Sequence, residues 1–265
     1  MNMIPSMETM ENAFSVQGKN VIITGGNRGI GKGIAQAMAQ CGANVAILAR
    51  DVETSEKTLG ELRTYGGTHR SYLCDVTEFE IAKKAVADVV RDYGVIDVLV
   101  NNSGIGRFFN VLDEDESLKN WFDVINVNLN GYFVMSYLVA KQMRRQNHGR
   151  IINISSNASR IVNLPQRMSS YNASKAAVDR MTMCLAHEWA EYNIRVNAIA
   201  PGYTETDLTY DKDTDKIEYW MSATPVGRFG KPIEVGAMAV YLASPATEQV
   251  TGAVFTIDGG YMLAR

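Results

Sequence analysis

Tyr171 and Lys175 stand four residues apart in the stretch Tyr-Asn-Ala-Ser-Lys, whose side chains suit proton transfer. The apolar residues around them recur at helical spacing, which predicts one helix carrying both side chains on the same face. A free phenol has a pKa of about 10, high for proton exchange at neutral pH. A cation one turn away favours the phenolate and lowers that pKa. The pair is a candidate general acid–base centre, but the same spacing is common on ordinary amphipathic helices, so its surroundings must decide.

A glycine-rich turn, Thr24 to Gly31, follows the apolar run 21–23 and opens a predicted helix over 29–41. Glycines let the backbone approach a pyrophosphate, and the helix N-terminus offers N–H groups and a favourable dipole. Ile34 stands where the strict G-x-G-x-x-G fingerprint has its third glycine, and an ordinary turn is the alternative. Four glycines within eight residues favour a dinucleotide site. Its predicted residues are Gly25, Asn27, Arg28, Gly29, Ile30 and Gly31.

The choice of dinucleotide depends on the end of the second predicted strand, 45–48. An acid at this place would bind the ribose hydroxyls of NAD, and Asp51 is the candidate. The strand, however, places Ala49 at its tip and Asp51 at the start of the next helix, where capping explains an acid. Arg50 and Arg28 would instead bracket a 2′-phosphate, since a guanidinium matches phosphate in charge and geometry. NADP(H) is therefore favoured over NAD(H).

The composition narrows the class of protein. The 265 residues carry a net charge of −3 and are 46% hydrophobic, which suits one large or two small domains. No basic block stands out, so nucleic acid is not expected as a partner. The three cysteines and three histidines lack metal-ligand spacing, which predicts reduced thiols, a cytoplasmic location and no metal site. Neither a signal peptide nor a long apolar segment is recognisable, so no membrane association is expected.

Short apolar runs rich in β-branched residues alternate with helical patterns along the chain. The runs lie at 21–23, 45–48, 71–73, 98–100, 151–154, 194–199 and 254–257. Near-continuous apolar strands separated by helices predict a parallel sheet covered on both faces. We therefore expect an α/β, three-layer, doubly wound domain with a seven-stranded parallel sheet over residues 16–265, preceded by a flexible leader over residues 1–15.

Three motifs occur in an order that resembles the short-chain dehydrogenase/reductase family. They are the glycine turn, the stretch Asn101-Asn102-Ser103-Gly104 after the fourth strand, and Tyr171-x-x-x-Lys175. The match extends from about residue 14 to the end of the chain. The resemblance implies a single Rossmann-type domain, hydride transfer between a nicotinamide and a carbonyl or alcohol, and a homotetramer.

The resemblance assigns further cofactor contacts. Asp75 and Val76 correspond to the pair beside the adenine, with the carboxylate on its amino group. Asn102, Ser103 and Gly104 correspond to the segment packed along the cofactor, where the family usually has alanine in place of Ser103. The segment after the sixth strand corresponds to the clamp on the nicotinamide carboxamide, with Pro201, Gly202, Thr204 and Thr206. Tyr171 and Lys175 also contact the cofactor in this family.

The stretch Asn126-Val127-Asn128-Leu129-Asn130-Gly131 holds three candidates for the asparagine of the family's active site. Alignment on the following Leu-x-Gly favours Asn128. A carboxamide can hold a water that links Lys175 to solvent as a proton relay. Asn126 and Asn130 are expected to make local backbone hydrogen bonds.

A predicted buried strand ends in two hydroxyls, Ser155 and Ser156. The second resembles the family's catalytic serine, which bonds the substrate oxygen and polarises it. Ser155 would then point into the packing, because successive strand residues face opposite ways. Ser156 precedes Tyr171 by fifteen residues, about two more than the commonest family spacing, so Ser155 stays as an alternative.

The segment 207–230 is polar and irregular in sequence, with acids that include Asp211 and Asp213. A long segment of this kind beside a site is often a lid. Its residues Tyr219, Trp220 and Met221 either line a substrate pocket or pack the lid onto the core.

The stretches 161–166, 171–178 and 201–208 and the ending 257–261 resemble a subgroup of the family: NADPH-dependent sorbose and xylulose reductases, fungal mannitol dehydrogenases and yeast carbonyl reductases. The expected substrate is a ketose or another small polar ketone. Asn163 and Gln166 could bond sugar hydroxyls, or brace their loop. Arg160 departs from the glycine common at that place, which affects the pocket entrance.

Three other functions remain open from the sequence. A 3-oxoacyl-carrier-protein reductase needs a basic docking patch, to which Arg144 and Arg145 could contribute, although the expected lid is acidic. A hydroxysteroid dehydrogenase is the second alternative. A non-catalytic NADP-binding protein is the third, and the presence of Ser156, Tyr171 and Lys175 argues against it.

Overall fold

The computed structural model describes residues 9–114, 117–207, 209 and 214–264. Seven parallel strands form one sheet in the order β3-β2-β1-β4-β5-β6-β7, which confirms the predicted doubly wound Rossmann-type fold. The strands are β1 (Asn20–Thr24), β2 (Asn44–Ala49), β3 (His69–Leu73), β4 (Val98–Asn101), β5 (Gly149–Ile154), β6 (Ile194–Pro201) and β7 (Val254–Ile257).

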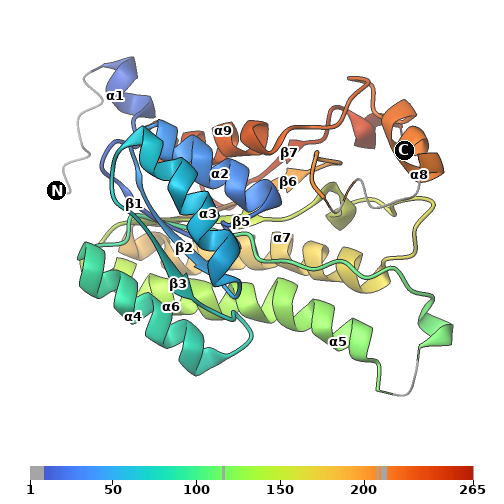
Figure 1. Ribbon diagram of the computed structural model, residues 1–265, viewed down its shortest axis with the longest axis horizontal. Helices are drawn as coiled ribbons and strands as arrows, with labels where there is room; N and C mark the ends of the chain where they lie inside the picture. The colour runs from blue at the N-terminus through green and yellow to red at the C-terminus, as the bar shows by residue number, and fades with distance from the viewer. Residues whose placement is uncertain (1–8, 115–116, 208, 210–213, 265) are drawn as a thin grey trace.

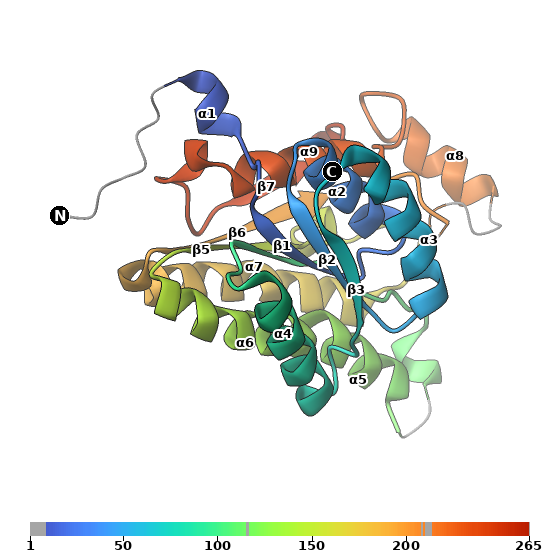
Figure 2. The ribbon, with the colours of Figure 1, turned by 60° about the vertical axis from the view of Figure 1, so that its left-hand side comes forward.

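Helices cover both faces of the sheet, as Figures 1 and 2 show. The helices are α1 (Met10–Phe14), α2 (Gly29–Gln40), α3 (Val52–Leu62), α4 (Phe79–Tyr93), α5 (Lys119–Ile125), α6 (Gly131–Gln146), α7 (Ser169–Trp189), α8 (Thr214–Ser222) and α9 (Pro232–Ala243). One core layer joins the sheet to α2, α3 and α9, and the other joins it to α4, α6 and α7. Because neighbouring strand residues face opposite sides, Ile23 belongs to the first layer and Ile22 to the second.

The strand order reverses between β1 and β4, and this point positions the site. In an open α/β sheet, ligands bind beyond the carboxyl ends of the strands at such a switch point. The glycine turn after β1 and the segment after β4 meet there. Thr24 Oγ accepts the backbone N–H groups of Asn102 at 2.9 Å and Ser103 at 3.0 Å. The two loops are thus held together by one hydroxyl at the end of β1.

Two segments that were predicted to be flexible or irregular, 1–15 and 207–230, each contain a helix. Within the expected leader 1–15, α1 packs onto the domain: Ala13 is buried and the Phe14 ring stacks on Tyr241 at 6.0 Å. The flexibility of the leader stays a prediction, and residues 1–8 lie outside the described residues. Within the expected lid 207–230, α8 is a regular helix, whereas Asp211 and Asp213 lie outside the described part. No helix in the described ranges is long and apolar enough to cross a membrane.

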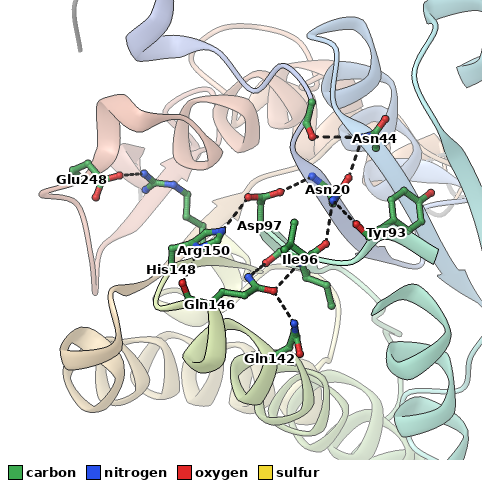
Figure 3. Close-up of polar contacts among 12 residues, drawn as sticks. Asn20, Asn44, Tyr93, Ile96, Asp97, Gln142, Gln146, His148, Arg150 and Glu248 are labelled. Atoms are coloured by element: carbon green, nitrogen blue, oxygen red, sulfur yellow. Dashed lines mark hydrogen bonds and ion pairs between the residues drawn. The ribbon is translucent and has the colours of Figure 1, made fainter. Parts of the chain in front are cut away.

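A polar network closes the amino-terminal edge of the sheet, opposite the switch point (Figure 3). Asp97 accepts the backbone N–H of Asn20 at 2.8 Å and lies 3.2 Å from His148 Nε2. This hydrogen bond raises the pKa of His148. Burial acts to raise the pKa of Asp97, but the bonds from His148 and Asn20 leave it below its ordinary value. The network ties β1, β4 and β5 together where their chains enter the sheet.

His148→Gln tests this ion pair through the pH dependence of stability. A raised histidine pKa stabilises the fold below about pH 6.5, and that contribution is lost as the pH rises through the folded-state pKa. The ion pair also needs an ionised Asp97. Because the pKa of Asp97 is lowered, its contribution to stability is present above about pH 4 and is lost as the pH falls through the folded-state pKa. Because the His148 side chain is 44% exposed, the loss should stay below about 1 kcal/mol. Thermal unfolding should show a lower Tm for the variant at pH 5.5 and a smaller difference at pH 8. The exposed His187, changed to glutamine, is the control; an equal Tm difference at both pH values would contradict the ion pair.

Candidate active site

A cavity of about 650 Å³ opens beyond the carboxyl ends of the strands. Sixteen of the predicted cofactor residues line it, together with Ser155 and Ser156. The sixteen are Gly25, Asn27, Arg28, Gly29, Ile30, Arg50, Asp75, Val76, Asn102, Ser103, Gly104, Tyr171, Lys175, Pro201, Gly202 and Thr206. Gly31 and Thr204 do not line the cavity. The structure therefore brings together residues that are far apart in the sequence and that the motifs had predicted to be neighbours.

The glycine turn forms a backbone cradle at one end of the cavity. Asn102 Nδ2 donates to the carbonyl oxygens of Thr24 at 3.0 Å and Gly25 at 3.1 Å. A Cβ on Gly31 would lie 2.2 Å from the Gly25 oxygen and 2.4 Å from Asn102 Nδ2. Gly31 is therefore required for the close packing of helix and turn, which is a different role from the cofactor contact expected for it.

The N-terminus of α2 reaches the cavity wall without a side-chain cap. Arg28 occupies the N-cap position and makes no capping hydrogen bond, while Gly29 and Ile30 line the cavity. The first N–H groups of a helix lack internal acceptors and carry the positive end of the dipole. An uncapped helix start at a glycine cradle suits an anionic group such as a pyrophosphate.

The second strand ends as predicted, with Asp51 used as a helix cap. Asp51 accepts the backbone N–H of Thr54 at 3.0 Å and its hydroxyl at 2.6 Å. These bonds hold the pKa of Asp51 below its ordinary value. Arg50 is exposed, and its Nη1 lies 3.6 Å from Asp75 Oδ2 in an ion pair that is open to solvent. Such pairs contribute little, so both side chains can turn to a ligand at low cost.

The predicted catalytic residues converge at the other end of the cavity, around the part of α7 that carries Tyr171 and Lys175. Tyr171 and Lys175 share one face of the helix, with Lys175 Nζ 5.7 Å from the Tyr171 ring centroid. Ser156 lines the cavity beside Tyr171, and its hydroxyl acts to lower the pKa of that phenol. Ser155 Oγ instead donates to the Lys175 carbonyl oxygen at 3.3 Å. The strand alternation thus separates the two serines as predicted, and Ser156 is the one beside the phenol.

The protonation of the pair differs from the expectation. Burial raises the pKa of Tyr171, against the opposing effect of its bond with Ser156. Burial lowers the pKa of Lys175 to about 7, against the charge of Asp179. The expected lowering of the phenol pKa by Lys175 is therefore wrong for this structure. Burial penalises the charged form of each group, and for Tyr171 this penalty sets the direction of the pKa shift.

Asn128 is held rigidly beside this centre. Its Oδ1 accepts the Ile105 N–H at 2.9 Å, and its Nδ2 donates to the Ile105 oxygen at 3.0 Å and to Ser174 Oγ at 3.2 Å. A single π-helical turn, η3 (Asn126–Asn130), carries it between α5 and α6. Such turns are frequent at functional sites. Asn126 and Asn130 bond each other through their side chains at 2.8 Å, and not the backbone as predicted.

The segment after β6 contributes Pro201, Gly202 and Thr206 to the cavity. Thr204 is buried beneath it, where its hydroxyl donates to the Gly202 oxygen at 3.2 Å. An extended segment would place these two threonines, which are two residues apart, on the same face, so the bends at residues 205 and 206 are what turn only Thr206 to the cavity. The motif did not distinguish them.

Comparisons with known proteins agree with this geometry. A family model described as "Enoyl-(Acyl carrier protein) reductase" matches residues 25–262. The chain is 38% identical to a galactitol 2-dehydrogenase (L-tagatose-forming) of Cereibacter sphaeroides, over 94% of this chain and 96% of that protein. It is 35% identical to a sorbose reductase of Candida albicans, over 94% and 88%. A gluconate 5-dehydrogenase from Burkholderia cenocepacia, solved in complex with NADP and tartrate, aligns with a TM-score of 0.90 and 33% identity over 97% of this chain and 100% of that one.

The chain belongs to the short-chain dehydrogenase/reductase family. It is an oxidoreductase acting on CH–OH or C=O groups, with a nicotinamide cofactor. The residues present fit such a dinucleotide, because the glycine cradle, the uncapped start of α2 and the exposed Arg28 and Arg50 line one continuous cavity with Tyr171. Among the described residues, no cluster of three or more His, Cys, Asp or Glu side chains could hold a metal ion.

This dehydrogenase/reductase uses Asn163 and Gln166 to brace the segment after β6. Gln166 Nε2 donates to Tyr203 Oη at 2.7 Å, and its Oε1 accepts the indole N–H of Trp220 at 3.1 Å. Asn163 lies 3.5 Å from the same Tyr203 hydroxyl. Both amides are buried and neither lines the cavity, which favours the bracing alternative.

An aromatic stack joins α8 to this brace. The Trp220 ring lies 4.4 Å from Tyr203, nearly parallel to it, and Tyr203 meets Tyr261 edge-on at 5.2 Å. Trp220 is buried and packs α8 onto the core, whereas Tyr219 and Met221 are 38% and 36% exposed. Arg160 lies away from the cavity, with Nη1 3.4 Å from Thr256 Oγ1. Its departure from the family's glycine therefore does not alter the cavity lining.

Gly31→Ala tests the cradle. The added methyl group clashes with backbone, which does not yield easily, so the free energy of unfolding should fall by about 1–3 kcal/mol. The displaced turn should also weaken binding of the nicotinamide dinucleotide about tenfold or more, measured by titration calorimetry with NADP⁺ and with NAD⁺. Gly60→Ala is the matched control, because a Cβ at that helical position in α3 meets no atom within 4 Å. A Gly31→Ala protein with wild-type Tm and NADP⁺ affinity would show that the close approach is not needed.

Proposed function

We propose that this enzyme is an NADP(H)-dependent oxidoreductase that interconverts a ketose, or another small polar ketone, and its alcohol. Its relatives support the substrate class, since those named above act on galactitol, sorbose and gluconate. The single observation that carries the reaction type is the meeting of Ser156, Tyr171 and Lys175 at one end of a cavity whose other end is a glycine cradle. The two ends suit a reacting carbonyl and a pyrophosphate.

The proposed roles follow from the contacts. A bound nicotinamide supplies or accepts the hydride at the carbonyl carbon. Tyr171 gives its proton to the carbonyl oxygen during reduction, and Ser156 holds that oxygen by a hydrogen bond. Lys175, one turn away and lining the cavity, replaces the proton and contacts the cofactor ribose. Asn128 orders a water that connects Lys175 to solvent.

NADP(H) is proposed over NAD(H) because of the charges at the end of β2. Arg28 and Arg50 are exposed at the cavity rim, while the nearby acid on that turn, Asp51, is engaged as a helix cap. Asp75 shares the rim with Arg50 and is left to the adenine amino group, as the resemblance implies. The relative solved with NADP supports the choice.

The further parts of the proposal concern assembly and location. Apolar side chains lie exposed on the α5–α6 side of the domain, with Phe122 53%, Phe133 50% and Tyr137 41% exposed. We propose that they are covered in a homotetramer in the cytoplasm.

Tyr171→Phe tests the reaction chemistry. Without the phenol hydroxyl, the turnover number for NADPH oxidation with a reactive ketose should fall by about 10²–10⁴-fold, while NADPH affinity stays nearly unchanged. A panel of ketoses, acetoacetyl thioesters and steroid ketones identifies the substrate class. Faster turnover of the thioesters or the steroids would replace the ketose proposal, and NADPH binding without any turnover would favour a non-catalytic protein. Near wild-type rates in Tyr171→Phe would remove Tyr171 from the mechanism.

Arg50→Ala tests the reading of the 2′-phosphate. A lost guanidinium–phosphate contact should weaken NADPH by about tenfold or more and leave NADH nearly unchanged, measured as dissociation constants by fluorescence titration. Arg63→Ala is the control, since Arg63 is exposed, pairs with Glu56 at 3.6 Å and does not line the cavity. Equal losses for the two cofactors in Arg50→Ala would mean that Arg50 does not distinguish them.

A further inference from the structure

Tyr132 is a fully buried tyrosine whose hydroxyl reaches the candidate active site. It follows Gly131 at the start of α6 and is 1% exposed. Its Oη donates to the Ile154 carbonyl oxygen at 3.1 Å, at the end of β5. Lys175 Nζ donates to the same oxygen at 2.7 Å and lies 3.4 Å from Tyr132 Oη. The phenol, the amine and the carbonyl oxygen thus form a closed set of contacts directly before Ser155 and Ser156.

The ring of Tyr132 adds a second contact with the same amine. Lys175 Nζ lies 4.9 Å from the ring centroid, closer than its 5.7 Å distance from the Tyr171 ring. An ammonium within about 6 Å of an aromatic face is attracted by the ring quadrupole, most strongly where water is excluded. The hydroxyl, as an acceptor, favours the charged form in the same way.

The position of Tyr132 is fixed by its backbone. A Cβ on Gly131 would lie 2.7 Å from Val76 Cγ2, so the chain can approach this closely only without a side chain. The carbonyl oxygen of Tyr132 accepts Asn101 Nδ2 at 3.5 Å. One turn earlier, Asn128 contacts Ser174, the residue before Lys175. The turn η3 and the start of α6 therefore contact two consecutive residues of α7 at the reacting end of the cavity.

Few other charged or titratable groups face Lys175. Tyr171 is on the same helix, and its pKa is raised by burial. Asp179, one turn further along α7, accepts Ser159 Oγ at 2.6 Å and lies 3.9 Å from Arg160 Nε, and its charge favours the charged form of Lys175. The remaining partners of the amine among the described residues are Tyr132 Oη and the Ile154 oxygen. Of these two, only Tyr132 is a side chain that substitution can remove.

We propose that Tyr132 is a positioning residue that holds the Lys175 amine at the floor of the cavity and favours its charged form. The proposal rests on the proposed function, in which Lys175 works with Tyr171. It adds a residue outside the Asn-Ser-Tyr-Lys set, acting on the substrate only through Lys175.

Tyr132→Phe tests the hydroxyl, and Tyr132→Leu removes the ring as well. The turnover number for ketone reduction is measured against pH at saturating NADPH. The decline of turnover with rising pH should begin about half to one pH unit lower in Tyr132→Phe than in the wild type, because the amine then loses its proton at a lower pH. Tyr132→Leu should shift it further, because the ring contact is also lost. The KM for the ketone should change little in Tyr132→Phe, since Tyr132 does not line the cavity.

Tyr93→Phe is the matched control. Its hydroxyl also donates to backbone carbonyl oxygens, those of Val45 at 3.2 Å and Thr68 at 3.3 Å, but away from the cavity. It should lower stability as Tyr132→Phe does and leave the pH profile in place. If the pH profile of Tyr132→Phe coincides in position with that of the wild type, whatever its absolute turnover number, the proposal is overturned and Tyr132 is a packing residue. Failure of the proposed function has a different signature, because Tyr171→Phe would then keep its activity.

Discussion

The Lys175 amine is a buried and closely held polar group of the candidate active site, and its neighbours are arranged around it. It is 3% exposed and is held by the Ile154 carbonyl oxygen at 2.7 Å and by the Tyr132 hydroxyl and ring. Removing an amine from water costs its charged form several kcal/mol unless partners compensate. In this protein the compensation is partial, and the pKa of Lys175 falls to about 7. A group with such a pKa can exchange protons at neutral pH, which is what a relay to Tyr171 needs.

This arrangement requires the strands β1, β4 and β5 and the helices α6 and α7 to be correctly placed relative to one another. β5 ends at Ile154, whose carbonyl oxygen accepts a hydrogen bond from the amine. The next two residues are Ser155 and Ser156. The π-helical turn before α6 places Asn128 and Tyr132 against consecutive residues of α7. The polar network at the opposite edge fixes where β1, β4 and β5 begin, and thus where they end (Figure 3). The geometry of the site depends in this way on contacts at the far end of the strands.

Much of this could be predicted from the sequence because it depends on local patterns. Short runs, apolar and β-branched at every strand except β3, together with their alternation with helical patterns, identified the strands of the sheet, and the Asp51 cap followed from the length of the second strand. Tyr132 could not be found in this way, because a tyrosine in a helical pattern is equally suited to an ordinary core position. The role of Gln166 stayed open for a related reason: a loop amide near a cavity bonds whichever partner the packing brings close, in this fold Tyr203 and Trp220. The prediction for the pKa of Tyr171 considered only the charge of Lys175. It left out the free-energy cost of burying both groups, and this cost becomes visible only in the packed structure.

The titration of the Lys175 amine tests the buried relay most directly. Protein labelled with ¹⁵N-lysine gives an Nζ signal for each lysine, and the spectrum of Lys175→Met identifies the one that belongs to Lys175. We expect this signal to titrate near pH 7 in the protein without cofactor, whereas a solvated lysine titrates at about pH 10. A Lys175 amine that also titrates at about pH 10 or above would show that it is solvated or firmly ion-paired, and would contradict the central role of its burial in the relay.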